Sequence, residues 1–300
     1  MKPLLFITAG DPFGIGPEIT VKALRHTAVR RACRAVVIGE PTSLYKAGFT
    51  EDLAPFIPID AYGTLPPKPQ PSKIGGLVSF QAVKTACQLS LKTGAPLVTA
   101  PISKQSWTMA HIPFTGHTEL LRNYTHHDGL MMFVSGKLCC GLVTEHFALS
   151  HLPLTQKKVE NAAFHLQTAL KKLRSHTPLI GVCAVNPHGS DNGKFGTEEK
   201  KILLPALKKL QTRGHFTGPL PSDVAWLQLR RGQLDGLLCM YHDQALLGLK
   251  LAATEPIVHL TAGLPFIRTS PTHGTAFDIA GKNKADASSM VAAILFAAAH

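Results

Sequence analysis

The sequence lacks several features that mark common classes of protein. No apolar stretch approaches the roughly 18 to 20 residues that a membrane-spanning helix requires, so we expect no membrane association. Its six cysteines include no Cys-x-x-Cys spacing, and most stand in apolar runs, as reduced core thiols do. The short apolar start leads directly into Gly10-Asp11-Pro12. We interpret it as the first core strand of a cytoplasmic protein rather than as a signal peptide.

Acidic residues are also scarce. Asp and Glu number 19 against 31 Lys and Arg, which gives a formal net charge of +12. The basic residues are scattered in short pairs such as Lys157-Lys158, and no basic run is interleaved with aromatic residues. A small anionic substrate explains the sign of the charge equally well, and we expect no nucleic-acid partner.

The sequence does contain a regular alternation of two patterns. Short runs rich in Val, Ile and Leu alternate with longer segments of helical period, which predicts an α/β fold with a largely parallel sheet. The 300 residues suffice for two domains or one large unit. The expected strands are 3–9, 34–39, 95–101, 131–135, 138–145, 179–185, 235–241 and 256–261, with 131–145 as a hairpin. The expected helices are 17–26, 75–92, 155–174, 197–212 and 286–298.

Polar and glycine-rich residues gather just after these strands. In open α/β sheets the ligand crevice forms at the carboxyl ends of the strands, so these loops are where we expect chemistry. The first loop, residues 10–18, has three glycines and a proline suited to a first helical turn. Its spacing is not Gly-x-Gly-x-x-Gly, and a plain tight turn is the alternative interpretation. The loops are 10–18, 101–104, 144–151, 186–196, 241–244 and 268–281.

Three histidines in these loops have unusual neighbours. His151 precedes Leu-Pro-Leu, His188 follows Asn-Pro, and His242 opens the sequence His-Asp-Gln. Neutral imidazoles suit zinc and similar divalent ions, and three protein ligands with open positions are typical of catalytic sites. Asp243 and Asp191 could orient a ring or transfer protons. The alternative for each histidine is an ordinary core or surface residue, because tens of residues separate them.

Two further segments offer partners for an anion. His117 and Thr118 lie near the expected start of a helix, where free N–H groups and the helix dipole favour negative charge. A threonine N-cap beside a buried neighbour is the alternative. Lys250 and Arg268 supply cations that could hold phosphate or carboxylate. Lone basic residues are, however, usually only solvated.

Residues 273–282 read His-Gly-Thr-Ala-Phe-Asp-Ile-Ala-Gly-Lys, a short segment bracketed by glycines. It resembles the adenosine-binding loop of the isocitrate/isopropylmalate dehydrogenase-like fold. Within that fold, the whole chain resembles the 4-hydroxythreonine-4-phosphate dehydrogenase family of vitamin B6 synthesis, because matching blocks occur in the expected order. The blocks are 10–19, 113–119, 150–154, 186–188, 218–223, 241–244 and 263–281.

The resemblance implies two α/β/α domains with an active site in the cleft between them, and a homodimer with shared active sites. We expect a discontinuous cofactor-side domain, 1–112 plus 262–300, and a metal, substrate and dimerisation domain, 113–261. The implied reaction is NAD- or NADP-dependent oxidation of the C3 hydroxyl of 4-phosphohydroxy-L-threonine. The β-keto acid product would lose CO₂ to give 3-amino-2-oxopropyl phosphate, in pyridoxal phosphate biosynthesis.

The resemblance also implies roles for individual residues. One divalent metal (zinc, cobalt, magnesium or manganese) would be bound by His151, His188 and His242. The substrate would be bound by His117, Thr118, Lys250, His259 and Arg268. The cofactor would be bound by Gly14, Gly16, His273, Gly274, Thr275, Asp278 and Gly281. The acid–base candidates are Asp243, Lys104 and Asp191.

Two positions depart from the family pattern. The family commonly has Asn-Pro-His-Ala-Gly-Glu where residues 186–191 read Asn-Pro-His-Gly-Ser-Asp, and Asp191 is shorter than glutamate. His259 stands where the family usually has asparagine, and the charge of a histidine depends on pH. A dehydrogenase of a phosphorylated threonate or erythronate, or of a carboxylated diol, is therefore an alternative. From other classes, an acyl-phosphate transferase on this fold and a non-catalytic binding protein are also alternatives.

Overall fold

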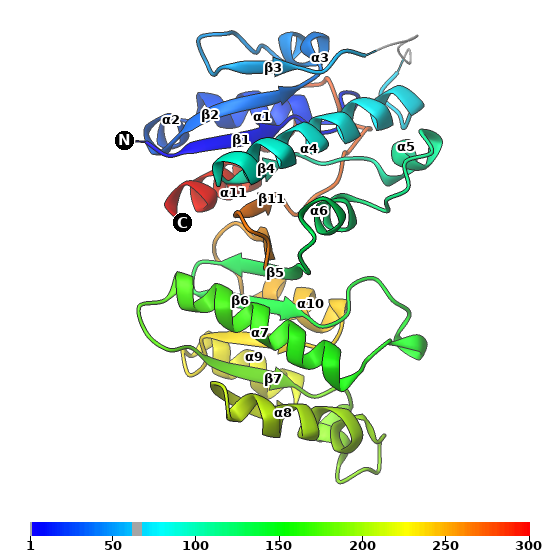
Figure 1. Cartoon of the computed structure of the whole chain (residues 1–300), viewed down its shortest axis with the longest axis vertical. Coiled ribbons are helices and arrows are strands. Elements are labelled where there is room, and N and C mark those ends of the chain that lie inside the picture. Colours follow the sequence, from blue (N-terminus) through cyan, green and yellow to red (C-terminus); the bar gives the residue numbers. More distant parts are fainter. Residues whose placement is uncertain (1, 62–67) are drawn as a thin grey trace. The chain divides into compact units, whose positions relative to one another are not determined.

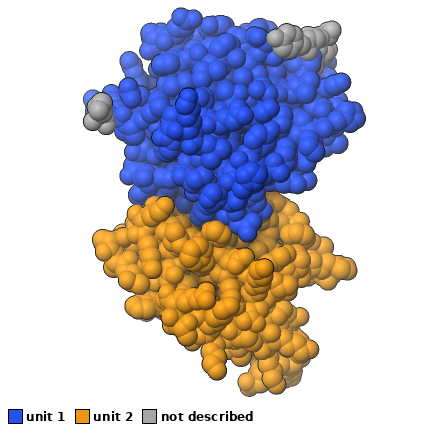
Figure 2. Space-filling model, viewed as in Figure 1, with its two compact units in different colours: residues 1–128, 258–300 blue, residues 129–257 orange. Residues whose placement is uncertain are grey.

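The computed structural model describes residues 2–61 and 68–300 and divides the chain into two compact units (Figure 2). Unit 1 comprises residues 1–128 and 258–300, and unit 2 comprises residues 129–257. The sequence-based boundaries at 112/113 and 261/262 divide the chain by function, and that division of roles stays a prediction. Among the described residues, no helix has both the length and the apolar character that a membrane span needs.

Unit 1 contains a mostly parallel sheet. Its strand order is β3-β2-β1-β4-β11-β10, and only β10 runs antiparallel to its neighbour β11. The strands are β1 (Leu4–Thr8), β2 (Arg34–Gly39), β3 (Phe56–Pro58), β4 (Leu97–Thr99), β10 (Val258–Ala262) and β11 (Arg268–Ser270).

Helices cover both faces of this sheet because its strands are apolar on both sides (Figure 1). Leu5 and Ile7 of β1 are buried in the core formed with the first group of helices, whereas Phe6 is buried in the core formed with the second. The first group is α1 (Gly16–Arg25), α2 (Thr27–Ala32), α3 (Pro41–Lys46) and α11 (Ser288–Ala299). The second group is α4 (Lys73–Thr93), α5 (Lys104–Met109) and α6 (His117–Thr125).

Unit 2 has a second α/β/α arrangement. Its strand order is β5-β6-β9-β7-β8, with a β5/β6 antiparallel hairpin followed by parallel pairs. The strands are β5 (Leu130–Ser135), β6 (Leu138–Leu142), β7 (Leu179–Cys183), β8 (His215–Leu220) and β9 (Gly236–Cys239). The α-helices are α7 (Gln156–Leu173), α8 (Leu204–Gln211), α9 (Ser222–Arg230) and α10 (His242–Ala252). Short helical turns span Leu149–His151, Pro187–Ser190 and Glu199–Leu203.

The two faces of the unit 2 sheet are covered by different helices. Leu166 and Leu170 of α7 lie against Gly141 and Gly236, so these glycines leave room for α7. Leu229 of α9 and Leu249 of α10 are instead buried with β-strand residues of the opposite face. The predicted α/β class and the hairpin at 131–145 are confirmed. The expected loop at 268–281 was wrong in its first residues, because 268–270 form β11.

Candidate active site

Three strands of unit 2 bring histidine-bearing loops to one edge of the sheet. Strands β6, β9 and β7 are parallel neighbours, so their carboxyl ends lie at the same edge. The loop after β6 contains His146 and His151, the loop after β7 contains His188, and α10 begins at His242 directly after β9. The topology therefore gathers the loops of all three predicted metal ligands.

His242 makes two contacts that bear on metal binding. Its Nδ1 lies 2.8 Å from Oδ1 of Asp243, which leaves Nε2 as the ring nitrogen available to a ligand. Its ring centroid lies 5.2 Å from that of His146. Sequence reasoning missed His146, although its position four residues after the end of β6 was a usable signal.

The other predicted ligands are more exposed. His151 ends a short helical turn, and its Nδ1 lies 2.8 Å from Oγ of Ser150. His188 has a positive φ of 54° within the turn Pro187–Ser190. Within residues 2–61 and 68–300, no three His, Cys, Asp or Glu side chains are grouped so that they could hold a metal ion. A single copy of the described chain thus brings the loops together but not three ligand atoms.

Two further predicted residues of unit 2 are solvent-exposed. Asp191 has a φ of 44°, and its Oδ2 lies 3.8 Å from Nζ of Lys194, so its charge is locally paired. Lys250 lies in the last turn of α10 and is exposed. Both side chains are therefore accessible to solvent in the described structure.

Unit 1 contains a buried arginine whose charge has no acidic partner. Arg268 on β11 is 1% exposed, and no carboxylate among the described residues pairs with it. Its Nη1 donates to Thr261 Oγ1 at 3.0 Å and to His259 Nδ1 at 3.3 Å, and its Nη2 donates to Thr99 Oγ1 at 2.7 Å. Nε lacks a partner in the described structure. Burial lowers the pKa of Arg268 to about 9, which shows how poorly this environment solvates the cation.

His117 at the start of α6 is electrostatically coupled to this arginine. Burial, followed by the nearby Arg268 and His259, holds the pKa of His117 well below its usual range. The ring is therefore neutral near neutral pH, and its buried Nε2 has no hydrogen-bond partner in the described part of the chain. Thr118 is the next residue of the same helix turn. A Cβ at Gly116, the N-cap of α6, would lie 3.7 Å from Cε of Lys104, so the Lys104 side chain reaches this helix start.

The two predicted cofactor segments of unit 1 touch each other. The amide of Ile15 donates to Thr275 O at 2.9 Å, and a Cβ added at Gly14 would lie 2.9 Å from the Thr275 Cβ. A Cβ at Gly16 would lie 2.1 Å from Ala9 O, so glycine is required there for packing. A Cβ at Gly274 would meet no atom of residues 2–61 and 68–300 within 4 Å, which leaves its backbone open to a ligand.

The remaining residues of this segment differ in exposure. His273 Nδ1 lies 3.2 Å from Gly274 O, and its Nε2 is buried. Asp278 is exposed, and Gly281 has a φ of 74°, which favours glycine.

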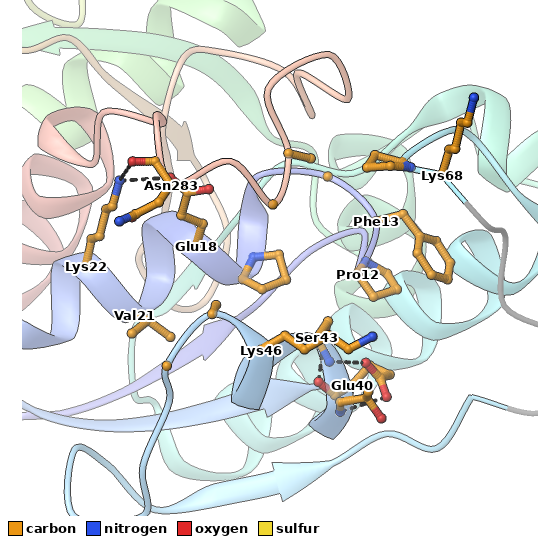
Figure 3. Close-up of a pocket in the computed structure, with 18 of the residues that line it drawn as sticks. Pro12, Phe13, Glu18, Val21, Lys22, Glu40, Ser43, Lys46, Lys68 and Asn283 are labelled. Atoms are coloured by element: carbon orange, nitrogen blue, oxygen red, sulfur yellow. Dashed lines mark hydrogen bonds and ion pairs between the residues drawn. The ribbon is translucent and has the colours of Figure 1, made fainter.

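A pocket of about 560 Å³ adjoins these segments at the carboxyl ends of β1 and β2 (Figure 3). Gly14 and Gly281, both predicted to bind the cofactor, line it. Lys22 in its wall is held by Glu18 Oε1 at 2.8 Å and Asn283 O at 3.1 Å. Lys46 and Lys68 also line the pocket and form no ion pair with a described residue. The pocket has the size of a small-molecule site and an excess of cations.

Comparison with known proteins places the chain in a family. The family model described as "Pyridoxal phosphate biosynthetic protein PdxA" matches residues 23–297. The chain belongs to the PdxA family. This confirms the resemblance seen in the sequence. As a member of this family, the chain is an oxidoreductase.

Individual relatives cover almost the whole of this PdxA family chain. A 4-hydroxythreonine-4-phosphate dehydrogenase of Desulfosudis oleivorans is 36% identical over 98% of this chain and 94% of its own. A D-threonate 4-phosphate dehydrogenase of Salmonella typhimurium is 38% identical over 97% of each chain. A crystal structure of 4-hydroxythreonine-4-phosphate dehydrogenase from Klebsiella pneumoniae is 33% identical, with a TM-score of 0.86 over 99% of this chain and 97% of that one.

A more distant structure bears on the fold alone. A β-decarboxylating dehydrogenase from Thermococcus kodakarensis is 12% identical, with a TM-score of 0.53 over 99% of this chain and 82% of that one. The fold of this PdxA family member is therefore shared with a wider set of dehydrogenases, and a nicotinamide cofactor follows from its family.

Proposed function

We propose that this chain oxidises the C3 hydroxyl of 4-phosphohydroxy-L-threonine to a β-keto acid, which loses CO₂ to give 3-amino-2-oxopropyl phosphate. The observation that carries the proposal is the buried and uncompensated charge of Arg268. Burying a cation is costly unless an anion pairs with it and hydrogen bonds satisfy its N–H groups, and in the described structure Arg268 lacks both a carboxylate and a partner for Nε. A phosphorylated substrate supplies that anion, and the relatives named above act on phosphorylated substrates.

In this proposal, the substrate phosphate is bound by charge-assisted hydrogen bonds. Arg268 offers its unpartnered Nε, and His117 offers Nε2, since both atoms are buried without a partner in the described structure. His259 and Thr261 hold the Nη1 end of the guanidinium and fix its plane. Thr118 and Lys250 are further substrate contacts predicted from the sequence, and they stay predictions.

The proposed metal ligands are one imidazole from each of three loops. The donor set fits a divalent metal, because neutral histidines at one sheet edge are suitable ligands. From the loop after β6, the ring contact with His242 favours His146 over the predicted His151. His188 and His242 complete the set. Because one described chain does not group three ligands, we propose that a homodimer assembles the site from both subunits.

The residues of the chain then divide the chemistry. Once bound, the metal would polarise the C3 hydroxyl and the nicotinamide would accept the hydride. Asp243 accepts a hydrogen bond from Nδ1–H of His242 and so fixes the tautomer in which Nε2 is free to bind a metal. Because this contact already uses Asp243 to orient the ring, we favour Lys104 as the group that takes the hydroxyl proton. The Lys104 side chain reaches the start of α6, where His117 lies. Asp191 stays a weaker acid–base candidate because it pairs with Lys194.

The proposed cofactor site lies along the two contacting segments of unit 1. Gly14, Gly16 and Thr275 form one wall, and His273, Gly274, Asp278 and Gly281 continue it. The absence of a side chain at Gly14 and Gly274 lets a dinucleotide approach the backbone closely. Lys46 and Lys68 in the adjoining pocket suit its phosphates. The proposal covers both NAD and NADP.

A second candidate substrate is D-threonate 4-phosphate, favoured by the 38% identity to the Salmonella enzyme. The two substrates share the phosphate, the secondary hydroxyl and the carboxylate, and they differ by an amine or a hydroxyl at C2. The Arg268 site therefore accepts both. Discrimination must come from a group that recognises C2.

The test measures reduced nicotinamide absorbance with each substrate, with NAD or NADP, before and after removal of metal by a chelator. We expect turnover of a phosphorylated substrate that stops on chelation and returns when zinc, cobalt, magnesium or manganese is added. Turnover of 4-phosphohydroxy-L-threonine well above that of D-threonate 4-phosphate supports the first substrate, and the reverse supports the second. Equal turnover with and without metal would refute the metal proposal.

A further inference from the structure

One buried side chain joins the loops that carry the proposed metal ligands. Gln244, in the first turn of α10, is 7% exposed. Its Oε1 accepts a hydrogen bond from Met240 N at 2.6 Å. Its Nε2 donates to Ala184 O at 2.6 Å and to Ser222 Oγ at 2.7 Å. The amide therefore uses both of its ends, one as acceptor and one as donor.

The network extends to a third loop through Met240. Its carbonyl accepts hydrogen bonds from Thr144 Oγ1 at 2.6 Å and from Thr144 N at 3.2 Å. Thr144 is 2% exposed. Met240 follows β9, Ala184 follows β7 and Thr144 follows β6. The side-chain amide of Gln244 and the backbone carbonyl of Met240 thus link the starts of the loops that carry His242, His188 and His146.

This arrangement requires an amide. A methionine of similar length would leave Met240 N and Ala184 O without partners, and buried unpaired groups are costly. A glutamate would keep the acceptor for Met240 N but would place a carboxylate oxygen against Ala184 O when ionised. Only glutamine or asparagine combines both functions, and asparagine is shorter.

We infer that Gln244 is a positioning residue that holds the three histidine-bearing loops of its own subunit in place, and thereby fixes the position from which each histidine enters a metal site assembled by two subunits. The inference rests on the proposed function, because it takes these histidines as the metal ligands. Residues behind metal ligands tune affinity by orienting them, and their loss typically costs about 10- to 100-fold in metal affinity or activity. Gln244 contacts the loops after β9 and β7 directly, and the loop after β6 through Met240, without being a ligand.

The experiment compares Gln244→Met with Gln167→Met in the purified full-length protein. Gln167 on α7 is also 7% exposed and lies in the same unit, but its Nε2 has no hydrogen-bond partner among the described residues. It is therefore a matched control for the loss of a buried amide. The readouts are the Kd for Co²⁺, by competition with a chromophoric chelator, and the visible spectrum of bound Co²⁺. Thermal unfolding of the metal-free proteins is measured in parallel.

We expect Gln244→Met to weaken Co²⁺ binding by about 10- to 100-fold and to alter the Co²⁺ spectrum. Gln167→Met should leave both unchanged, even where it lowers Tm. Wild-type Kd and spectrum in Gln244→Met would overturn the inference, and so would equal weakening in the control. If the wild type itself binds no Co²⁺, the proposed metal site fails and the inference with it, whereas substrate turnover is tested separately.

A second variant covers the case in which Gln244→Met does not fold. Thr144→Val keeps the side-chain volume and removes only the hydroxyl hydrogen bond to Met240 O. We expect a smaller loss of Co²⁺ affinity than for Gln244→Met, with a changed spectrum. An unchanged affinity and spectrum in Thr144→Val would show that the carbonyl link plays no part in metal geometry, contrary to the inference.

Discussion

Arg268 illustrates how a residue can be positioned to bind a ligand while it lowers the stability of the ligand-free protein. Its charge lies beneath the surface with hydroxyls and an imidazole around it rather than a carboxylate. Hydroxyls accept hydrogen bonds from Nη1 and Nη2 but leave the net charge in place. An anion that enters this site can pair with the guanidinium charge and accept a hydrogen bond from Nε–H, which has no partner in the described structure.

We therefore predict opposite effects of Arg268→Met on stability and on binding. Removal of the buried cation should raise the Tm of the ligand-free protein, because burial already disfavours the charged form. The same change should raise KM for the phosphorylated substrate by about 10- to 100-fold, the value of one or two charge-assisted hydrogen bonds. Thermal unfolding with and without inorganic phosphate measures the first effect, and steady-state kinetics the second. Retention of phosphate protection in the variant would contradict the assigned role.

The two histidines of the β6 loop provide a second prediction. His146→Ala should abolish Co²⁺ binding and turnover, because its ring lies against His242. His151→Ala should retain both, since His151 ends an exposed turn and the ring contact with His242 is made by His146. Metal content of the purified variants and turnover at saturating metal distinguish them. The opposite pattern would restore His151 as the ligand.

At the scale of elements, the long periodic segments were predictable, whereas several of the short ones were not. The expected helices at 75–92 and 155–174 correspond to α4 and α7, since an apolar stripe repeated over many turns is a strong signal. β3 and β11 have only three residues each, and β8 contains Gly218-Pro219, so none of them shows a clear alternating pattern. Several short helices, such as α2 and α3, were missed for the same reason.

The site shows the same limit. The loops could be placed from the sequence, because each follows an apolar strand. The sequence could not predict which histidine of the loop after β6 contacts His242, because that depends on the local path of the backbone. The hydrogen bond from Gln244 to Ala184 was likewise not predictable, since it joins residues 60 positions apart that only the order of the strands brings together.

The contact between the β1–α1 loop and the 273–281 segment gives a prediction about this pair of elements. Gly14→Ala should raise the cofactor KM and lower Tm, because the new Cβ would lie 2.9 Å from Thr275 Cβ and O. Gly274→Ala should raise the cofactor KM while leaving Tm near that of the wild type, because its Cβ would enter open space. Cofactor titrations and thermal unfolding of both variants test this pair. An unchanged cofactor KM in Gly274→Ala would remove that backbone from the proposed site.

For the whole molecule, the state of His117 couples stability to pH. Burial holds the pKa of His117 below its unfolded value of about 6.5, so the unfolded chain binds more protons between the two pKa values. Stability should therefore rise with pH through this window and fall on acidification, by up to about 1.4 kcal/mol per pH unit. Urea unfolding between about pH 7 and pH 5 should show a steeper loss in the wild type than in His117→Asn. If the unfolding free energies of the two proteins changed equally with pH, His117 would bind its proton as readily in the native state as in the unfolded chain.

The assembly of the metal site gives the last prediction, which concerns two copies of the chain. If His188 and His242 at one site come from different subunits, His188→Ala and His242→Ala are each inactive alone. Co-expression of the two variants should nevertheless recover activity, because each mixed dimer then contains one intact site and one doubly damaged site. With random pairing, half of the dimers are mixed, so we expect about a quarter of wild-type turnover. A mixture as inactive as its parents, in a sample shown by differential tagging to contain mixed dimers, would place both histidines of each site on the same chain. The fourfold difference between wild type and mixture thus reports which subunit supplies each ligand.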